Sequence, residues 1–255
     1  MRWSEGMLER TRIPRLRESA LSRSRAGRAW ANCGAFFAVL AFGTMPFAAQ
    51  APPAPAQHFV VVIDAAHGGD DAGARLSGEM EKAYTLALSV RLRSLLMARG
   101  MSVVTTRESD TTLDADHRAE IANHADAEAC LSLHASETGA GVHLFLSSLA
   151  PLPRTTFLPW KTAQAAWMTR SVALAGVFNS ALNQAGIPVT LGRIALPGID
   201  SMTCPAVAIE VAPQAKAGES GSANLDDSDY QARVAEALAA ALVEWRASDK
   251  GGHQP

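Results

Sequence analysis

From residue 58 onward, the apolar positions of the chain follow two different spacings. Short runs rich in Val, Ile and Leu are typical of buried strands, and longer stretches with an apolar residue every three or four positions are typical of amphipathic helices. The first pattern predicts strands at residues 59–63, 102–106, 129–133, 142–146 and 205–211. The second predicts helices at residues 79–99, 113–125, 162–185 and 229–246. Residues 149–159 and 216–227, rich in Pro or in Gly, Ser and Asp, are predicted to be loops.

This order of elements predicts the fold class. Strands separated by helices imply βαβ units and a mainly parallel sheet. Residues 142–146 follow the preceding strand too closely for a crossover, so we expect a hairpin and one antiparallel strand there. The expected fold is therefore α/β, a single three-layer domain with a mainly parallel, twisted sheet flanked by helices.

The N-terminal part has the order of a secretory signal. Residues 1–28 hold eight Arg and three Glu, residues 29–51 hold no charge, and small residues follow at 48, 49 and 51. A basic, then apolar, then small-residue order indicates export, with cleavage after the Ala-Gln-Ala of residues 49–51 or an uncleaved anchor in the inner membrane as the two outcomes. A buried N-terminal helix is the alternative. Export predicts a location in the periplasm or cell envelope.

The same boundaries divide the chain into regions. Residues 1–51 are the expected export signal or signal anchor, and residues 52–57 are a Pro/Ala linker. Residues 58–248 form the expected catalytic domain, and residues 249–255 are a tail. The acidic balance of residues 52–255, with 15 basic and 22 acidic side chains, argues against nucleic acid as a partner. The membrane is then a partner only through the N-terminal segment.

Only two cysteines remain in the exported part, and their number and spacing limit the possible disulfide, metal and redox chemistry. Cys130 and Cys204 permit one disulfide, but Cys130 lies in an apolar run, where we expect it to pack as a small hydrophobic residue. No Cys-x-x-Cys pair exists, which argues against a thiolate zinc site or a thioredoxin-like redox site.

Polar residues stand where the predicted strands end. His67, followed by two Gly residues, comes just after the first strand, His134 ends the third, and Glu210 lies inside the last. Glu81 lies near the start of the first helix. Ligands of open parallel sheets bind outside the carboxyl ends of the strands, so these side chains are candidates for one site.

Two His and one carboxylate form a ligand set of catalytic zinc sites, with a fourth position left for water. A second carboxylate that does not bind the metal can take a proton from that water and pass it to a leaving nitrogen. Glu210 is the candidate for this role, because an ionised Glu in a buried strand is costly without a partner. Taken singly, each His is more often a structural residue, so spacing alone leaves a metal site and a structural role both open.

Several ordered motifs resemble one family, the zinc-dependent N-acetylmuramoyl-L-alanine amidases of the Amidase_3 type, over residues 60–246. The motifs are Val-Val-Ile-Asp-Ala-Ala-His-Gly-Gly at 61–69, Glu-Lys at 81–82, Thr-Arg-x-x-Asp at 106–110, Arg-x-x-x-Ala-Asn at 118–123, Ser-Leu-His at 132–134 and Pro-Ala-Val-Ala-Ile-Glu at 205–210. The resemblance implies His67, Glu81 and His134 as ligands of Zn²⁺, with Glu81 rather than Glu79 in that role. It implies Glu210 as the general acid/base.

The resemblance implies a peptidoglycan hydrolase that cuts the amide between N-acetylmuramic acid and the L-alanine of the stem peptide. Its partners would be peptidoglycan or muropeptides, and whether a protein activator acts on it stays open. Two alternatives remain, an exported zinc peptidase acting on soluble peptides and a non-catalytic homologue that binds cell wall. The chain departs from the family pattern at Ala65 and Ala66, where Pro-Gly is usual, and at Ser136, where Asn is usual. Residues 211–214 depart from it as well, and residues 188–203 fit it poorly. These segments would line the substrate groove.

The remaining polar and aromatic candidates have less specific expectations. Four His residues are expected to be solvated or structural: His58, His117, His124 and His143. Arg107 and Arg118 are expected to form structural ion pairs, with binding of a substrate carboxylate as the alternative. Trp160 and Trp167 are expected to pack against the long helix, with a sugar platform as the alternative. The segment between residues 146 and 162 is short, so we expect no large inserted helix that would block the zinc site there.

Overall fold

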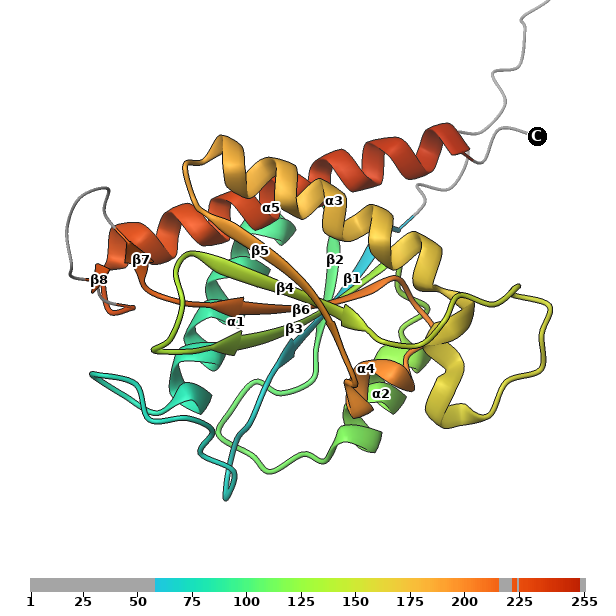
Figure 1. The fold of residues 1–255 in the computed structure, drawn as a ribbon, viewed down its shortest axis with the longest axis horizontal. Helices are drawn as coiled ribbons and strands as arrows, with labels where there is room; N and C mark the ends of the chain where they lie inside the picture. The colour runs from blue at the N-terminus through green and yellow to red at the C-terminus, as the bar shows by residue number, and fades with distance from the viewer. Residues whose placement is uncertain (1–57, 216–221, 224, 253–255) are drawn as a thin grey trace, which may run out of the picture. The chain divides into compact units, whose positions relative to one another are not determined.

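The described part of the chain is built around a six-stranded sheet with helices on both faces (Figure 1). The computed structural model describes residues 58–215, 222–223 and 225–252, all of which fall within one compact unit, Pro53–Pro255. The strands are β1 (Val60–Ala65), β2 (Ser102–Thr105), β3 (Ala129–Ala135), β4 (Val142–Ser147), β5 (Val189–Ile194) and β6 (Ala206–Val211), with a short separate pair, β7 (Gln214–Ala215) and β8 (Ser222–Ala223). The helices are α1 (Glu81–Ala98), α2 (Ala115–His124), the 3-10 helix η1 (Trp160–Ala166), α3 (Met168–Gln184), α4 (Pro197–Asp200) and α5 (Ser228–Gly252).

The sheet is mainly parallel, as the alternation of strands and helices predicts. Its strand order is β2-β1-β3-β6-β4-β5. The first four strands in this order run parallel to one another, β4 runs antiparallel to β6, and β5 runs parallel to β4. The carboxyl ends of β1, β3 and β6 therefore meet at one edge, which is where the candidate site residues were expected to gather.

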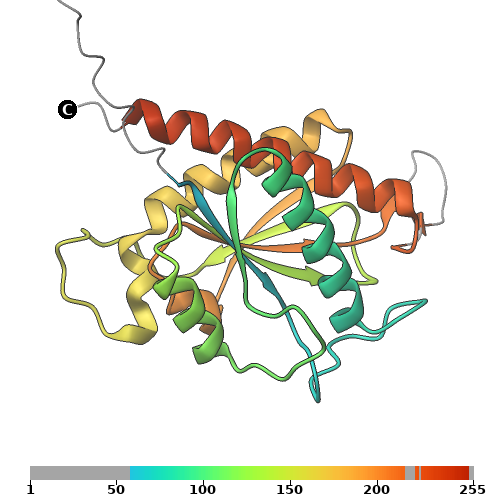
Figure 2. The ribbon, with the colours of Figure 1, turned by 180° about the vertical axis from the view of Figure 1, so that it is seen from behind.

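The two faces of the sheet bury different sets of side chains. Leu131 and Leu133 of β3 join the larger core cluster under α1, α3 and α5. Cys130 of β3 points the other way and joins the smaller cluster, which Ala119 of α2 and Ile199 of α4 complete. Figures 1 and 2 show this division, with α3 and α5 side by side across the sheet from α2 and α4. The strand periodicity of two thus produces the expected three layers.

The predicted hairpin between β3 and β4 is wrong. β4 is antiparallel, as expected, but its neighbour is β6, which lies between β3 and β4. β6 is apolar on both faces, and such a strand belongs in the middle of a sheet. The connection over residues 136–141 therefore crosses the carboxyl end of β6 rather than forming a tight turn.

The predicted helix at residues 162–185 is broken into η1 and α3 at Trp167. The amide of Gln164 donates to the carbonyls of Met202 and Cys204, both at 3.0 Å, and these contacts hold η1 apart from the axis of α3. Tertiary contacts here outweigh local helical periodicity. Four short or exposed elements were not predicted, namely β5, α4, β7 and β8. β5 is a largely exposed edge strand without apolar alternation, and α4 has only four residues.

Cys130 does not only pack as a small hydrophobic residue, because it is bonded to Cys204. Their Cα atoms lie 6.2 Å apart, within the range of ordinary disulfides. The bond joins β3 to the segment just before β6 and closes a loop over a sequence separation of 74.

The expected export segment, residues 1–51, and the linker, residues 52–57, lie outside the described residues, so their boundaries stay predictions. Among the helices described, none has the length and apolar character to cross a membrane.

We expect loss of the disulfide to destabilise the domain by about 4 kcal/mol, because a cross-link over this separation removes much of the entropy of the unfolded chain. The test is urea denaturation of the protein with Cys130→Ala and Cys204→Ala together, and of the wild type with and without reductant. Reductant should lower the wild-type midpoint and leave that of the double variant unchanged. An equal midpoint for all of these samples would contradict the prediction.

Candidate active site

Two buried guanidinium groups fasten the turn that follows β1. Arg107 donates to the carbonyls of Ala65 at 2.8 Å and Ala66 at 3.0 Å. Arg118 donates to the carbonyls of Ala65 at 2.8 Å and His67 at 2.7 Å. The carbonyl of Ala66 also accepts from the hydroxyl of Thr85 at 2.8 Å. Buried backbone acceptors at the end of a central strand need such partners. These bonds hold His67 at a φ of 63°, a left-handed conformation that few residues other than Gly adopt.

Asp64 neutralises Arg118 from within the sheet. Its Oδ1 accepts from Nη1 of Arg118 at 2.6 Å and from the hydroxyl of Thr106 at 2.7 Å, and its Oδ2 accepts from the hydroxyl of Ser132 at 2.7 Å. The side chains of Asp64 and Arg118 are only 5% and 10% exposed. A buried ion pair is tolerated when its remaining atoms are hydrogen-bonded in this way. Arg118 thus forms the structural ion pair that was expected, while Arg107 is bound mainly by backbone carbonyls.

His67, Glu81 and His134 meet at the carboxyl edge of the sheet. Glu81 is the first residue of α1 and His134 is near the end of β3. Oε1 of Glu81 lies 3.1 Å from Nε2 of His67 and 3.0 Å from Nδ1 of His134. One ligand atom from each residue lies within 4.8 Å of the others. Within the described ranges, no other three His, Cys, Asp or Glu side chains come together in this way.

The charges in this cluster depend on one another. Burial favours the neutral form of Glu81, but hydrogen bonds from His134, His67 and the backbone amides of Ala74 and Ala135 outweigh it and hold the pKa of Glu81 well below its usual range. The hydrogen bond to Glu81 raises the pKa of His67 against the effect of burial. The carboxylate is thus ionised and attracts positive charge to the point between the two rings.

Asp71 and Gly73 complete the surroundings of His67. Oδ2 of Asp71 lies 2.8 Å from Nδ1 of His67, and its Oδ1 accepts from the amide of Gly73 at 3.1 Å. A carboxylate behind a His fixes the tautomer and orientation of the ring. Gly73 has a φ of 65°, and a Cβ there would lie 2.7 Å from Cδ2 of His67 and 2.8 Å from Oε2 of Glu81. Only Gly lets the backbone close this tightly over the cluster.

Glu210 lies one strand away from the cluster. The register of β3 and β6 pairs it with His134. Residues paired in register on neighbouring strands point to the same side of a sheet, so Glu210 lies on the His134 side. The predicted alternative ligand, Glu79, is outside the cluster, and burial together with the nearby Asp226 raises its pKa.

A cavity of about 370 Å³ opens beside the cluster. His67 and His134 line its polar wall, and Leu196, Ile199 and Met202 from the α4 segment line an apolar wall. A pocket with one apolar wall and a few convergent polar groups is typical of a ligand site.

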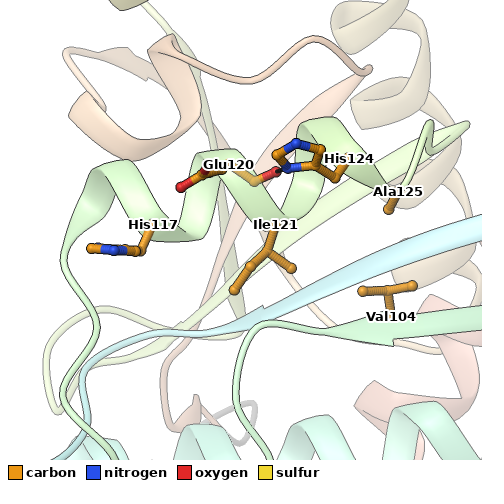
Figure 3. A pocket seen from close by; sticks show the side chains of 6 residues that line it. All are labelled: Val104, His117, Glu120, Ile121, His124 and Ala125. Carbon is orange, nitrogen blue, oxygen red and sulfur yellow. Dashed lines mark hydrogen bonds between the residues drawn. The ribbon is translucent and has the colours of Figure 1, made fainter.

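Other predicted candidates lie elsewhere. A second cavity, of about 450 Å³, lies over α2. Figure 3 shows the imidazoles of His117 and His124 apart from each other on the helix, with Ile121 facing Val104. Both His residues are exposed, as expected for solvated side chains, and neither belongs to the cluster of His67, Glu81 and His134. Trp160 is 43% exposed at the start of η1, so it is not packed as expected.

Trp167 is half-buried, with the guanidinium of Arg154 over its ring at 3.9 Å. His58, also exposed, lies with its Nδ1 3.3 Å from the hydroxyl of Ser102.

His143 makes a contact that the sequence did not predict. Its Nδ1 lies 2.8 Å from Oε1 of Glu210. The register of β4 and β6 pairs the two residues. The signal was present in the sequence, since His143 lies in an apolar strand, but the wrong hairpin placed that strand next to β3 instead of β6.

We expect Arg118→Ala to lower the free energy of unfolding by about 3–5 kcal/mol, because Asp64 would stay buried without its charged partner. Urea denaturation measures the change. Arg93→Ala is the matched control, since the Arg93–Glu108 pair is exposed and its loss should cost about 1 kcal/mol or less. If Arg118 instead bound a substrate carboxylate, stability would be nearly unchanged and KM would rise.

Comparisons with known proteins agree with the motifs. The profile of the Amidase_3 family, described as N-acetylmuramoyl-L-alanine amidase, matches residues 61–244. The germination-specific N-acetylmuramoyl-L-alanine amidase of Bacillus subtilis (strain 168) is 35% identical over an alignment of 89 residues. That alignment covers 29% of this chain and 38% of that protein. N-acetylmuramoyl-L-alanine amidase AmiA of Escherichia coli (strain K12) is 37% identical over 94 residues, 35% of this chain and 32% of that one. The matches thus span only about a third to two fifths of these curated relatives.

The fold also matches a solved structure. The catalytic domain of CwlV, an N-acetylmuramoyl-L-alanine amidase from Bacillus (Paenibacillus) polymyxa var. colistinus, superposes with a TM-score of 0.56 at 28% identity. The alignment covers 74% of this chain and 98% of that one. The resemblance predicted from the motifs is confirmed, and the chain belongs to the Amidase_3 family of N-acetylmuramoyl-L-alanine amidases.

Proposed function

We propose that the chain is a zinc-dependent peptidoglycan hydrolase that cleaves the amide between N-acetylmuramic acid and the L-alanine of the stem peptide. The observation that carries the proposal is the meeting of His67, Glu81 and His134 at one edge of the sheet, with Glu210 on the next strand, in a chain of this family. Family membership supports the amide and the polymer, and the cluster supports the metal.

The donor atoms of the cluster suit zinc. Two imidazole nitrogens and one carboxylate oxygen leave a fourth position for water or substrate. Metal ligands must be deprotonated, and Glu81 is ionised between the two rings. Asp71 behind His67 is the kind of group that orients a metal ligand. Zinc at this site would polarise the amide carbonyl and lower the pKa of a water molecule.

Glu210 supplies the proton transfer in this proposal. Its carboxylate accepts the proton that the attacking water loses and then gives it to the amide nitrogen. The bond between the lactyl carbonyl carbon and this nitrogen breaks. The products are a free carboxyl group on N-acetylmuramic acid and a stem peptide with a free L-alanine amine. The apolar wall of Leu196, Ile199 and Met202 lies where part of the substrate would pack beside the reacting bond.

The substrate lies outside the cytoplasm, and two features support export. Residues 1–51 have the order of a secretory signal or anchor. The Cys130–Cys204 disulfide is typical of proteins from oxidising compartments. We propose the periplasm or cell envelope as the location, with residues 58–248 as the catalytic domain.

The two alternative functions are less well supported. A non-catalytic wall-binding homologue would have no need for His67, Glu81, His134 and Glu210 together. A peptidase acting on soluble peptides would use the same chemistry, but the family profile and the matched solved structure belong to muramoyl-L-alanine amidases.

The reaction itself can be tested on purified peptidoglycan. The zinc-loaded protein should release from purified peptidoglycan intact stem peptides with a free L-alanine amine, identified by mass spectrometry. Glu210→Gln should lower kcat about 10²–10⁴-fold, because the proton acceptor is lost while the carboxamide keeps a similar shape. Zinc stoichiometry of this variant should stay at the wild-type value.

Soluble peptides without sugar serve as the control substrate. Cleavage of these peptides, with intact peptidoglycan left uncut, would support the peptidase and contradict the proposal. So would cleavage of peptidoglycan at full rate in the presence of a chelator.

A pair of variants distinguishes the roles of the two neighbouring carboxylates, Glu79 and Glu81. Glu81→Gln should abolish stoichiometric zinc binding, measured by metal analysis after dialysis, because the ionised oxygen between the two imidazoles is lost. Glu79→Gln should bind zinc as the wild type does, since Glu79 is outside the cluster. Loss of zinc from the Glu79 variant but not from the Glu81 variant would overturn the proposed ligand set.

A further inference from the structure

Three polar side chains form a row across neighbouring strands. The register of β3 and β6 pairs His134 with Glu210, and the register of β6 and β4 pairs Glu210 with His143. Register partners on adjacent strands point to the same side and lie about 5 Å apart. Glu210 therefore has a member of the metal-binding cluster on one side and His143 on the other.

The contact between His143 and Glu210 is directed at one atom. Nδ1 of His143 lies 2.8 Å from Oε1 of Glu210, and the two side chains are 16% and 29% exposed. The proposed proton transfer needs an ionised Glu210, which can only accept, so it requires the proton of this bond on Nδ1. Across the part of the chain that is described, no second hydrogen-bond partner occurs for the Glu210 carboxylate. Oε2 is thus the oxygen left for the reaction.

The imidazole of His143 is itself held in place. The segment that crosses over the end of β6 brings Gly139 onto the ring, where a Cβ would lie 2.3 Å from Cε1 and 2.5 Å from Nε2 of His143. Gly139 also has a φ of 91°, and this backbone conformation is a second reason why Gly is favoured there. Phe145, two residues along β4, meets the ring edge to face at 6.2 Å between centroids. Backbone pairing of β4 with both β6 and β5 fixes the base of the side chain.

We infer that His143 is a positioning residue for Glu210: its Nδ1–H holds Oε1, so that Oε2 is aimed at the proton-transfer position. The inference rests on the proposed function, which gives Glu210 the proton transfer. A Glu side chain has several rotatable bonds, and an unfixed carboxylate would spend much of its time in unproductive rotamers. The His143 contact removes that freedom before substrate binds.

The kinetic test uses three substitutions in the full chain. His143→Leu replaces the donor with an apolar side chain. We expect kcat on peptidoglycan to fall about 10–100-fold, with KM and zinc stoichiometry unchanged. His143→Asn restores a donor near the position of Nδ1 and should recover most of the lost kcat. His124→Leu, at an exposed His on α2, is the matched control and should leave kcat at the wild-type value.

A second measurement does not depend on activity or on metal. The ¹⁵N shifts of the His143 ring in the metal-free protein should report the Nδ1–H tautomer, and Glu210→Ala should convert the ring towards the Nε2–H form. An unchanged kcat in His143→Leu would overturn the inference, as would an Nε2–H tautomer in the wild type. Loss of zinc together with kcat would assign His143 a structural role instead. An inactive wild type would contradict the proposed function, while the ring shifts would still test the contact.

Discussion

The buried guanidinium groups of Arg107 and Arg118 are the contacts on which the rest of the site depends. They donate to three successive carbonyls, those of Ala65, Ala66 and His67, where β1 leaves the sheet. The carbonyl of Ala66 also accepts from the hydroxyl of Thr85. Buried carbonyls without a hydrogen-bond partner would be costly. Because the turn is fixed, His67 can hold a left-handed backbone conformation and direct its ring towards Glu81. Asp64 neutralises the charge of Arg118.

Sheet topology then brings the remaining groups to the same edge. Glu81 comes from the start of α1, His134 from the end of β3, and Glu210 from β6. The insertion of β6 between β3 and β4 is the decisive step, because it gives Glu210 a His neighbour on each side. A direct β3–β4 hairpin would have put His143 next to β3 and left Glu210 without this partner. The mixed direction of the sheet is thus part of the construction of the site.

The sequence predicted the fold class and the meeting of His67, Glu81 and His134 at one site. This was possible because each residue stands at the start or end of an element with a clear apolar period. It did not predict the neighbours of β6, because strand order depends on packing of both faces and not on local pattern. The Cys130–Cys204 bond was missed for a similar reason. The two residues are 74 positions apart, and only the pairing of β3 with β6 brings them together. β5 is exposed at the sheet edge and carries no alternation from which it could be recognised.

The chain departs from the family pattern at Ala65 and Ala66, yet the turn there is held by backbone atoms. Arg107 and Arg118 bind the backbone carbonyls at these positions, and the amide of Ala66 donates to the carbonyl of Leu133 at 3.1 Å. None of these bonds uses a side-chain atom of either Ala. The two methyl groups are buried, so the turn demands small side chains there but no particular chemistry. The bonds that fix the turn before His67 therefore do not depend on which small residues stand at positions 65 and 66.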